Sequence, residues 1–327
     1  MGVRPTIRLS SVVAVLLFAA PLAAEAQAGA GLRIGVLWSA SEDAAPFISA
    51  FRQGLRELGT KGQDAALEIR NANGRPERLP GLAAELVRLK VDVILAQSNP
   101  AIVAAQKATT SIPIVMLSAS DPVALGFVAS LARPGGNITG LSIQTLDTGG
   151  KRLQLLKEAV PTLSRVAVLW DPDFVGGREL FRHAEAAAPG LGLQLQLVAA
   201  QGPGELDGAF AAMRRERAGA VFLIGSPTLF AHRIRIADLA VKHRLPTMCA
   251  LREYAEAGCL IGYGASLIDQ YGRAAYFVDR LLKGAKPADL PVEQPTKFDF
   301  VINLRTAKAL GLTIPQPLLL RADRLVE

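Results

Sequence analysis

Four segments carry a polar side chain directly before a proline, where it could start a helix or bind a ligand. They are the ends of VDVILAQSNP, SIPIVMLSASDP, RVAVLWDP and AVFLIGSP, with Asn99, Asp121, Asp171 and Ser226 before the proline. Asn, Asp and Ser accept hydrogen bonds from backbone N–H groups at a helix start, and proline suits the first helical position. Each segment therefore predicts a helix start, whose unpaired N–H groups and positive dipole end attract polar or anionic groups.

The apolar runs before these residues indicate the elements that must position them. Each run is short, rich in Val, Ile and Leu, and lacks alternation, which is typical of a strand buried on both faces of a parallel sheet. Ligands of open α/β sheets bind beyond the carboxyl ends of the strands. We therefore expect a binding cleft there, lined by Trp38, Ser39, Ser98, Asn99, Ser120, Asp121, Asp171, Ser226 and Tyr263.

Specific roles follow for some of these residues. Helices starting at 100 and 122 are expected to hold an anionic or polar head group such as a carboxylate, and Asp171 to pair with an ammonium. Trp38 and Tyr263 follow strands of opposite halves, where their rings could sandwich a flat ligand. The alternatives are that the polar residues only cap helices and that Trp38 packs between the domains. The cleft would then suit a branched-chain amino acid, a urea-like solute or a sugar.

Catalytic and metal-binding motifs do not occur in the sequence. The three histidines, His183, His232 and His243, lack metal-ligand spacing, and HExxH, CxxC, G-x-S-x-G and Walker A motifs are not found. No set of nucleophile, base and orienting residue can be assembled. The sequence therefore predicts a binding protein without enzymatic activity, cofactor or metal.

The first 26 residues read as a secretory signal peptide. Arg4 and Arg8 precede the apolar stretch 12–22, and Ala24-Glu25-Ala26 fits the small-x-small cleavage rule, so cleavage is expected after Ala26. The apolar stretch is shorter than a membrane-spanning helix needs. The protein is therefore predicted to be periplasmic.

Two other features bear on partners and redox state. The net charge of +7 is spread along many predicted helices without interleaved aromatic residues, so no nucleic-acid partner is expected. Cys249 and Cys259 lie near the ends of neighbouring predicted strands. They either form a disulfide, which an exported protein permits, or are two small buried apolar residues.

Strands and helices alternate along the chain, and the pattern restarts at RVAVLWD (165–171), which matches LRIGVLW (32–38). Strands joined by helices are parallel, so the repeat predicts an α/β protein of two Rossmann-like lobes with parallel sheets. Lobe one is expected to comprise 27–142 plus parts of 265–327, and lobe two 143–264 plus parts of 285–327. A single large sheet is the alternative.

Several longer motifs resemble one known family. AFRQGLRELG (50–59), SLARPGGNITGLS (130–142), GKRLQLLKEAVP (150–161) and the segment 284–312 are similar to the ABC transporter substrate-binding protein family, a periplasmic-binding-protein group of the type I fold. The resemblance implies two lobes joined by a three-strand hinge, a ligand trapped between them, and delivery to an ABC transporter permease in the inner membrane. It also implies no catalytic residues, and relatives that hold aromatic amino acids.

The expected function is therefore solute capture by a monomeric periplasmic protein whose small-molecule ligand is an aromatic or other amino acid. Closure of two lobes around the ligand would favour the closed state through its differential affinity. A ligand-sensing lobe of a signalling system is the alternative, and an exported hydrolase is a more distant one.

Overall fold

The computed structural model describes residues 1–2, 31–40, 44–59, 61–143, 145–174 and 176–327. Almost all of the predicted signal peptide, 1–26, lies outside the described residues. Residues 32–327 form one unit that contains every described helix and strand. No described helix has the length and apolar character needed to cross a lipid bilayer.

Lobe one is built on a parallel sheet. Five strands of the described chain lie in the order β2-β1-β3-β4-β5 and pair in parallel. The interiors of β1, β3 and β4 are rich in buried Val, Ile, Leu and Met, because helices cover both faces of the sheet, whereas the edge strand β2 is partly exposed. The elements are β1 (Arg33–Trp38), α1 (Ala45–Glu57), β2 (Ala66–Asn71), α2 (Leu79–Arg88), β3 (Val93–Gln97), α3 (Asn99–Ala108), β4 (Ile114–Ala119) and β5 (Ile138–Ser142).

Lobe two is built on a second, separate sheet, whose described strands lie in the order β12-β11-β10-β9-β8-β6-β7. Its strands are β6 (Arg165–Trp170), β7 (Gln194–Ala199), β8 (Ala220–Leu223), β9 (Thr247–Cys249), β10 (Ile261–Ala265), β11 (Phe298–Asn303) and β12 (Arg324–Val326). Its helices are α4 (Thr145–Ala159), α5 (Gly177–Ala187), α6 (Pro203–Arg215), α7 (Pro227–Ala231), α8 (Arg233–Lys242), α9 (Arg252–Glu256), α11 (Leu304–Leu310) and α12 (Gln316–Arg321). Two sheets in two lobes confirm the predicted fold class.

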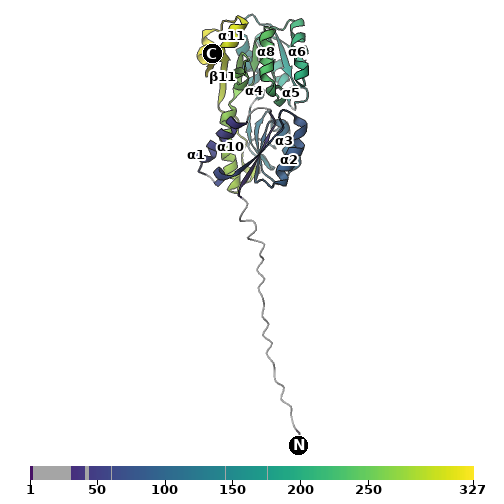
Figure 1. The fold of residues 1–327 in the computed structure, drawn as a ribbon, viewed down its shortest axis with the longest axis vertical. Coiled ribbons are helices and arrows are strands. Elements are labelled where there is room, and N and C mark those ends of the chain that lie inside the picture. The colour runs from purple at the N-terminus through teal and green to yellow at the C-terminus, as the bar shows by residue number, and fades with distance from the viewer. Residues whose placement is uncertain (3–30, 41–43, 60, 144, 175) are drawn as a thin grey trace. The chain divides into compact units, whose positions relative to one another are not determined.

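One helix of the second half packs on lobe one. Helix α10 (Leu267–Leu282) leaves β10 and lies beside α1 (Figure 1), where Tyr271 contacts Trp38 and Phe47. The chain then returns to β11, which pairs antiparallel with β10. This pair departs from the predicted parallel pairing, because β11 is reached from the other lobe and not through a crossover helix on its own sheet.

The polar residues at the strand ends do not all start helices as predicted. Ser226 does: its Oγ accepts a hydrogen bond from the N–H of Leu229 at 3.1 Å and caps α7. No helix begins at 122 or 172 in the described chain, where turns follow Asp121 and Asp171. Each carboxylate accepts a hydrogen bond at 3.0 Å from a nearby backbone N–H, and this local bond stabilises a turn in place of a helix. Asn99 lies inside α3, and Ser98 precedes the helix.

Candidate ligand-binding site

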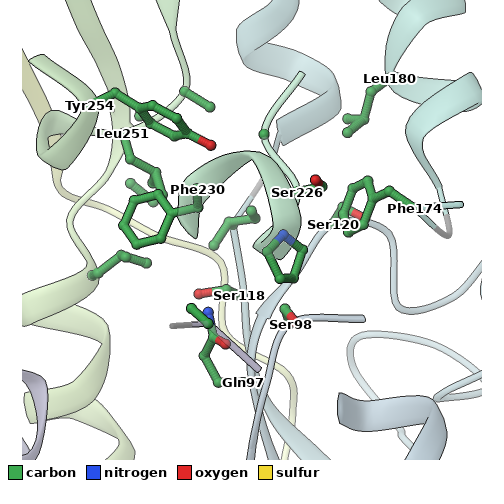
Figure 2. Close-up of a pocket in the computed structure, with 18 of the residues that line it drawn as sticks. Gln97, Ser98, Ser118, Ser120, Phe174, Leu180, Ser226, Phe230, Leu251 and Tyr254 are labelled. Carbon is green, nitrogen blue, oxygen red and sulfur yellow. The ribbon is translucent and has the colours of Figure 1, made fainter. Parts of the chain in front are cut away.

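A cavity lies between the two lobes, at the carboxyl ends of β3 and β4 on one side and of β8 and β9 on the other (Figure 2). The volume within which the centre of a water molecule can lie is about 80 Å³. One water needs roughly 10–15 Å³ in this measure, so the cavity has room for several waters or a small organic molecule. Its position agrees with the site expected for open α/β sheets.

The wall from lobe one is polar. Four of its residues are labelled in Figure 2: Gln97 ends β3 and Ser98 follows it, while Ser118 lies in β4 and Ser120 directly after it. A hydrogen bond of 2.9 Å joins the hydroxyls of Ser98 and the buried Ser39, which also donates to Oε1 of Gln97. These contacts fix the hydroxyl and amide groups that a polar part of a ligand would meet.

Ser120 is held by Asn99, a fully buried residue of α3. The side-chain amide of Asn99 donates to Oγ of Ser120 at 2.6 Å, and the backbone N–H of Ser120 donates to Oδ1 of Asn99 at 3.2 Å. Asn99 therefore lies behind the wall and positions Ser120 within it.

Two serines of this wall have an unusual backbone conformation. Ser98 and Ser118 have φ of 73° and 58°, in the left-handed region that residues other than glycine rarely adopt. The hydroxyl of Ser118 donates to Gln270 on α10 at 3.2 Å, and the amide of Gln270 donates to the carbonyl of Ser142 at 2.9 Å. Such strain persists where the surroundings hold a residue firmly, and it is common in ligand-binding sites.

The wall from lobe two is largely apolar. Phe174, Leu180, Phe230, Leu251 and Tyr254 surround the cavity on this side (Figure 2). The rings of Phe230 and Tyr254 meet edge to face, with centroids 5.1 Å apart. These side chains come from α5, from α7, from the residues before and within α9, and from the turn after β6. An apolar or aromatic body would fit against them.

Ser226 is a polar exception in lobe two. Its hydroxyl donates to Oδ2 of Asp171 at 3.0 Å while it caps α7. Asp171 is buried and does not line the cavity, so Ser226 lies between this carboxylate and the cavity. A negative charge is thus located directly behind one part of the wall.

The lobes approach each other at Gly176, just before α5. A Cβ atom at this position would lie 3.2 Å from Oγ of Ser120 and 3.3 Å from Nδ2 of Asn99, both in lobe one. Gly176 also has φ of 90°, which favours glycine. The absence of a side chain at Gly176 therefore permits the close contact beside the cavity.

The predicted aromatic sandwich is wrong. Trp38 is buried in lobe one, with its ring centroid 5.3 Å from that of Phe47 and 5.8 Å from that of Tyr271. Tyr263 stacks on Phe298 at 5.9 Å. Neither ring lines the cavity. Trp38 faces α1 and α10, so it is also not the inter-domain contact proposed as the alternative.

The structure brings some of the predicted site residues to the cavity and places others behind it. Ser98, Ser120 and Ser226 line the cavity, whereas Ser39, Asn99 and Asp171 lie behind it and hydrogen bond to those three serines. Asp121 is half-buried in its turn and does not line the cavity. Ligand contact by any of these residues stays a prediction.

The apolar lining residues were missed by sequence reasoning. Phe230 and Tyr254 each lie four residues beyond a lining residue that follows a strand, Ser226 and Ala250. That spacing is one helical turn, so a search of the first turn after each strand would have found both. Among the described residues, no group of three or more His, Cys, Asp or Glu could hold a metal ion.

One ionisable group next to this wall has a shifted pKa. Burial raises the pKa of Glu253, the neighbour of Tyr254 in α9, to about 7, although Arg252 opposes the shift. The side chain of Glu253 is 14% exposed, with Nε of Arg252 at 3.5 Å from its Oε1. Glu253 lies outside the cavity lining.

Comparison with known proteins gives consistent matches. A family model described as ABC transporter substrate binding protein matches residues 33–326. A tyrosine-binding protein from Clostridioides difficile (strain R20291) is 25% identical over 267 residues, which are 80% of this chain and 75% of that protein.

Two solved structures share the fold over nearly the whole chain. One is an ABC domain in complex with L-Trp from Streptococcus pneumoniae, with a TM-score of 0.84 and 24% identity over 91% of this chain and 100% of that chain. The other is a conserved domain protein from Vibrio cholerae, with a TM-score of 0.82 and 26% identity over 90% of this chain and 100% of that chain.

Proposed function

Because the chain belongs to the ABC transporter substrate-binding protein family, we propose that its cavity captures an aromatic amino acid or a closely related acid. Binding a small solute for an ABC transporter is the function of this family. The identity of the ligand is the proposal. The observation that carries it is the opposition of a polar wall from lobe one to an apolar, partly aromatic wall from lobe two.

A ligand with a charged head and an apolar body satisfies both walls. The hydroxyls of Ser98 and Ser120, beside the start of α3, would donate to its carboxylate. Its ammonium would approach Ser226, with the carboxylate of Asp171 directly behind. Its ring would contact Phe230 and the other apolar side chains of lobe two. A sugar would leave that apolar wall without a partner.

The comparisons support this choice unequally. The tyrosine-binding relative supports an aromatic amino acid as the ligand. The structure with L-Trp supports the fold alone, because its identity to this chain is below 25%. The sequence of the first 26 residues supports export to the periplasm, and we propose that the chain acts there as a monomer, without catalysis, and delivers its ligand to an inner-membrane permease.

A thermal-shift screen followed by mass spectrometry tests the proposal. Purified protein is heated with tyrosine, tryptophan and phenylalanine, and with leucine, urea and glucose as competing classes. A ligand that binds the native state raises the unfolding temperature. We expect the aromatic amino acids to give the largest increases, and mass spectrometry to recover them unchanged. Stabilisation by glucose or urea alone would contradict the proposal, and recovery of a converted product would reveal an enzyme.

A further inference from the structure

Arg152 of α4 is a buried cation that has no counter-charge among the residues that the structure describes. It is only 2% exposed, and its guanidinium carbon lies 4.8 Å from the centroid of the Phe222 ring. Its Nε and Nη1 atoms have no hydrogen-bond partner among the described residues, and no ion pair with Arg152 occurs there either. Burying a charge is costly unless it is paired, so such a group calls for an explanation.

The neighbours of Arg152 do not neutralise it. Arg152 lies close to Cys249 on β9, but burial raises the pKa of the Cys249 thiol well above its ordinary value, so the thiol stays neutral. Burial also lowers the pKa of Arg152 to about 10, which still leaves the guanidinium charged at neutral pH. The face of Phe222 compensates the charge only in part.

Arg152 lies one helical turn from a residue that lines the cavity. Thr148, one helical turn earlier in α4, lines the cavity, and helical side chains lean toward the N-terminus of their helix. Two neighbours of Arg152, Phe222 and Cys249, lie on strands that lead into the lining residues Gly225 and Ala250. Arg152 itself does not line the cavity, so it would act through the wall or through a water.

We infer that Arg152 is the counter-charge for the carboxylate of the bound ligand and thereby selects acids over uncharged or purely cationic solutes. The inference rests on the proposed function, whose ligand carries such a carboxylate. In a cavity enclosed between two lobes, the attraction between charges is screened less than in bulk water. The carboxylate would then lie between Ser98 and Ser120 of lobe one and the side of lobe two formed by Thr148, with Arg152 one helical turn beyond, while Asp171 behind Ser226 offers the opposite charge to the ammonium.

The test compares two ligands on matched variants. Tyrosine carries the carboxylate, and tyramine lacks it but keeps the ammonium and the phenol ring. Arg152→Met removes the buried charge and keeps the length of the side chain. Arg178→Met is the control, because exposed Arg178 also lies over a ring of lobe two, 5.3 Å from the centroid of Trp170. Arg152→Lys keeps the charge.

We expect calorimetry to show that Arg152→Met weakens tyrosine binding by about tenfold or more, while tyramine binds as well as before or better. Arg152→Lys should keep most of the affinity for tyrosine. Arg178→Met should leave the affinities for tyrosine and tyramine unchanged. The melting temperature of ligand-free Arg152→Met should rise, because apolar replacement of a buried unpaired charge is often stabilising. A packing role on Phe222 predicts the opposite: a lower melting temperature and equal losses for both ligands.

Failure of the inference differs from failure of the proposed function. Wild-type affinity for tyrosine in Arg152→Met, or equal loss of tyrosine and tyramine, would overturn the role of Arg152 alone. If the wild type binds leucine but no aromatic amino acid, the comparison of leucine with isoamylamine tests Arg152 in the same way. If it binds only uncharged solutes, both proposals fall. Arg152→Gln is the second neutral variant if Arg152→Met does not fold.

Discussion

Substitution of Gly176 by alanine tests whether the lobes meet beside the ligand. The new Cβ would lie 3.2 Å from Oγ of Ser120 and 3.3 Å from Nδ2 of Asn99, and both atoms belong to the other lobe. These distances are shorter than ordinary van der Waals contact, so the side chains of Ser120 and Asn99, or the lobes that carry them, must give by a few tenths of an ångström to accommodate the methyl group. Because the contact exists only where the lobes come together, the substitution disfavours the closed state.

Two energies contribute to the effect of Gly176→Ala. The φ of 90° costs a residue with a Cβ about 1–2 kcal/mol, and this cost lowers the stability of the open and closed states alike. Overpacking between the lobes adds about 1–3 kcal/mol to the closed state alone. A differential cost of that size lowers ligand affinity by about 5- to 150-fold.

The assay is calorimetric titration of tyrosine, with the melting temperature of the ligand-free protein measured in parallel. Gly192→Ala is the matched control, because Gly192 is also in lobe two, has φ of 66°, and has no heavy atom within 4 Å of a Cβ built there. Both variants should lose stability, but only Gly176→Ala should lose affinity. If Gly176→Ala binds tyrosine as tightly as the wild type, the bound state does not bring Gly176 against Ser120, and the reasoning is refuted.

Three further predictions concern charge and packing. Asp171→Ala should weaken the binding of tyrosine by about 2–5 kcal/mol in calorimetric titrations, and the binding of the ammonium-free 3-(4-hydroxyphenyl)propionate much less. Equal losses of binding free energy for the two ligands would show that Asp171 does not act on the ammonium. Trp38→Ala should lower the free energy of unfolding by about 3–5 kcal/mol in denaturant titrations and leave the affinity of the folded protein unchanged, because Trp38 packs in lobe one. Folding keeps Glu253 protonated up to pH about 7, whereas the unfolded group ionises near 4.5, so wild-type stability should fall as pH rises through that window. The melting temperature of Glu253→Gln should fall less over the same window; parallel curves for the two proteins would show that Glu253 does not titrate there.

The strands and the place of the cavity could be predicted from the sequence because they depend on local patterns. The apolar run within VDVILAQSNP is buried on both faces, and the observed strand Val93–Gln97 coincides with it. The polar residues after each run had to lie at one end of the sheet, which placed Ser98 and Ser120 at the cavity. Short-range sequence information sufficed for these features.

The turns after Asp121 and Asp171 show where local patterns were insufficient. An Asp before a proline suits a helix cap and also a turn in which its carboxylate accepts a nearby backbone N–H. The structure contains the turn at both positions. The two outcomes use the same residue types, so the sequence alone did not separate them.

The surroundings of Trp38 depend on which face of β1 carries its side chain. Ile34, Val36 and Trp38 alternate along β1 and share one hydrophobic cluster with Phe47 of α1. The alternation was visible in the sequence, but α10 arrives from more than 200 residues later and completes the burial of the ring through Tyr271. Phe230 and Tyr254 were missed for a different reason: they lie one helical turn beyond Ser226 and Ala250, and only the residues directly after each strand were considered.

Calorimetric titration of wild-type protein with tyrosine, followed by displacement with tryptophan and glucose, shows whether the cavity binds an aromatic amino acid. We expect one tyrosine bound per chain, competition by tryptophan at the same site, and no displacement by glucose. The heat-capacity change should be negative, because the ring is buried against the apolar wall of lobe two. The absence of binding heat for both aromatic amino acids, together with saturable binding of glucose, would contradict the account.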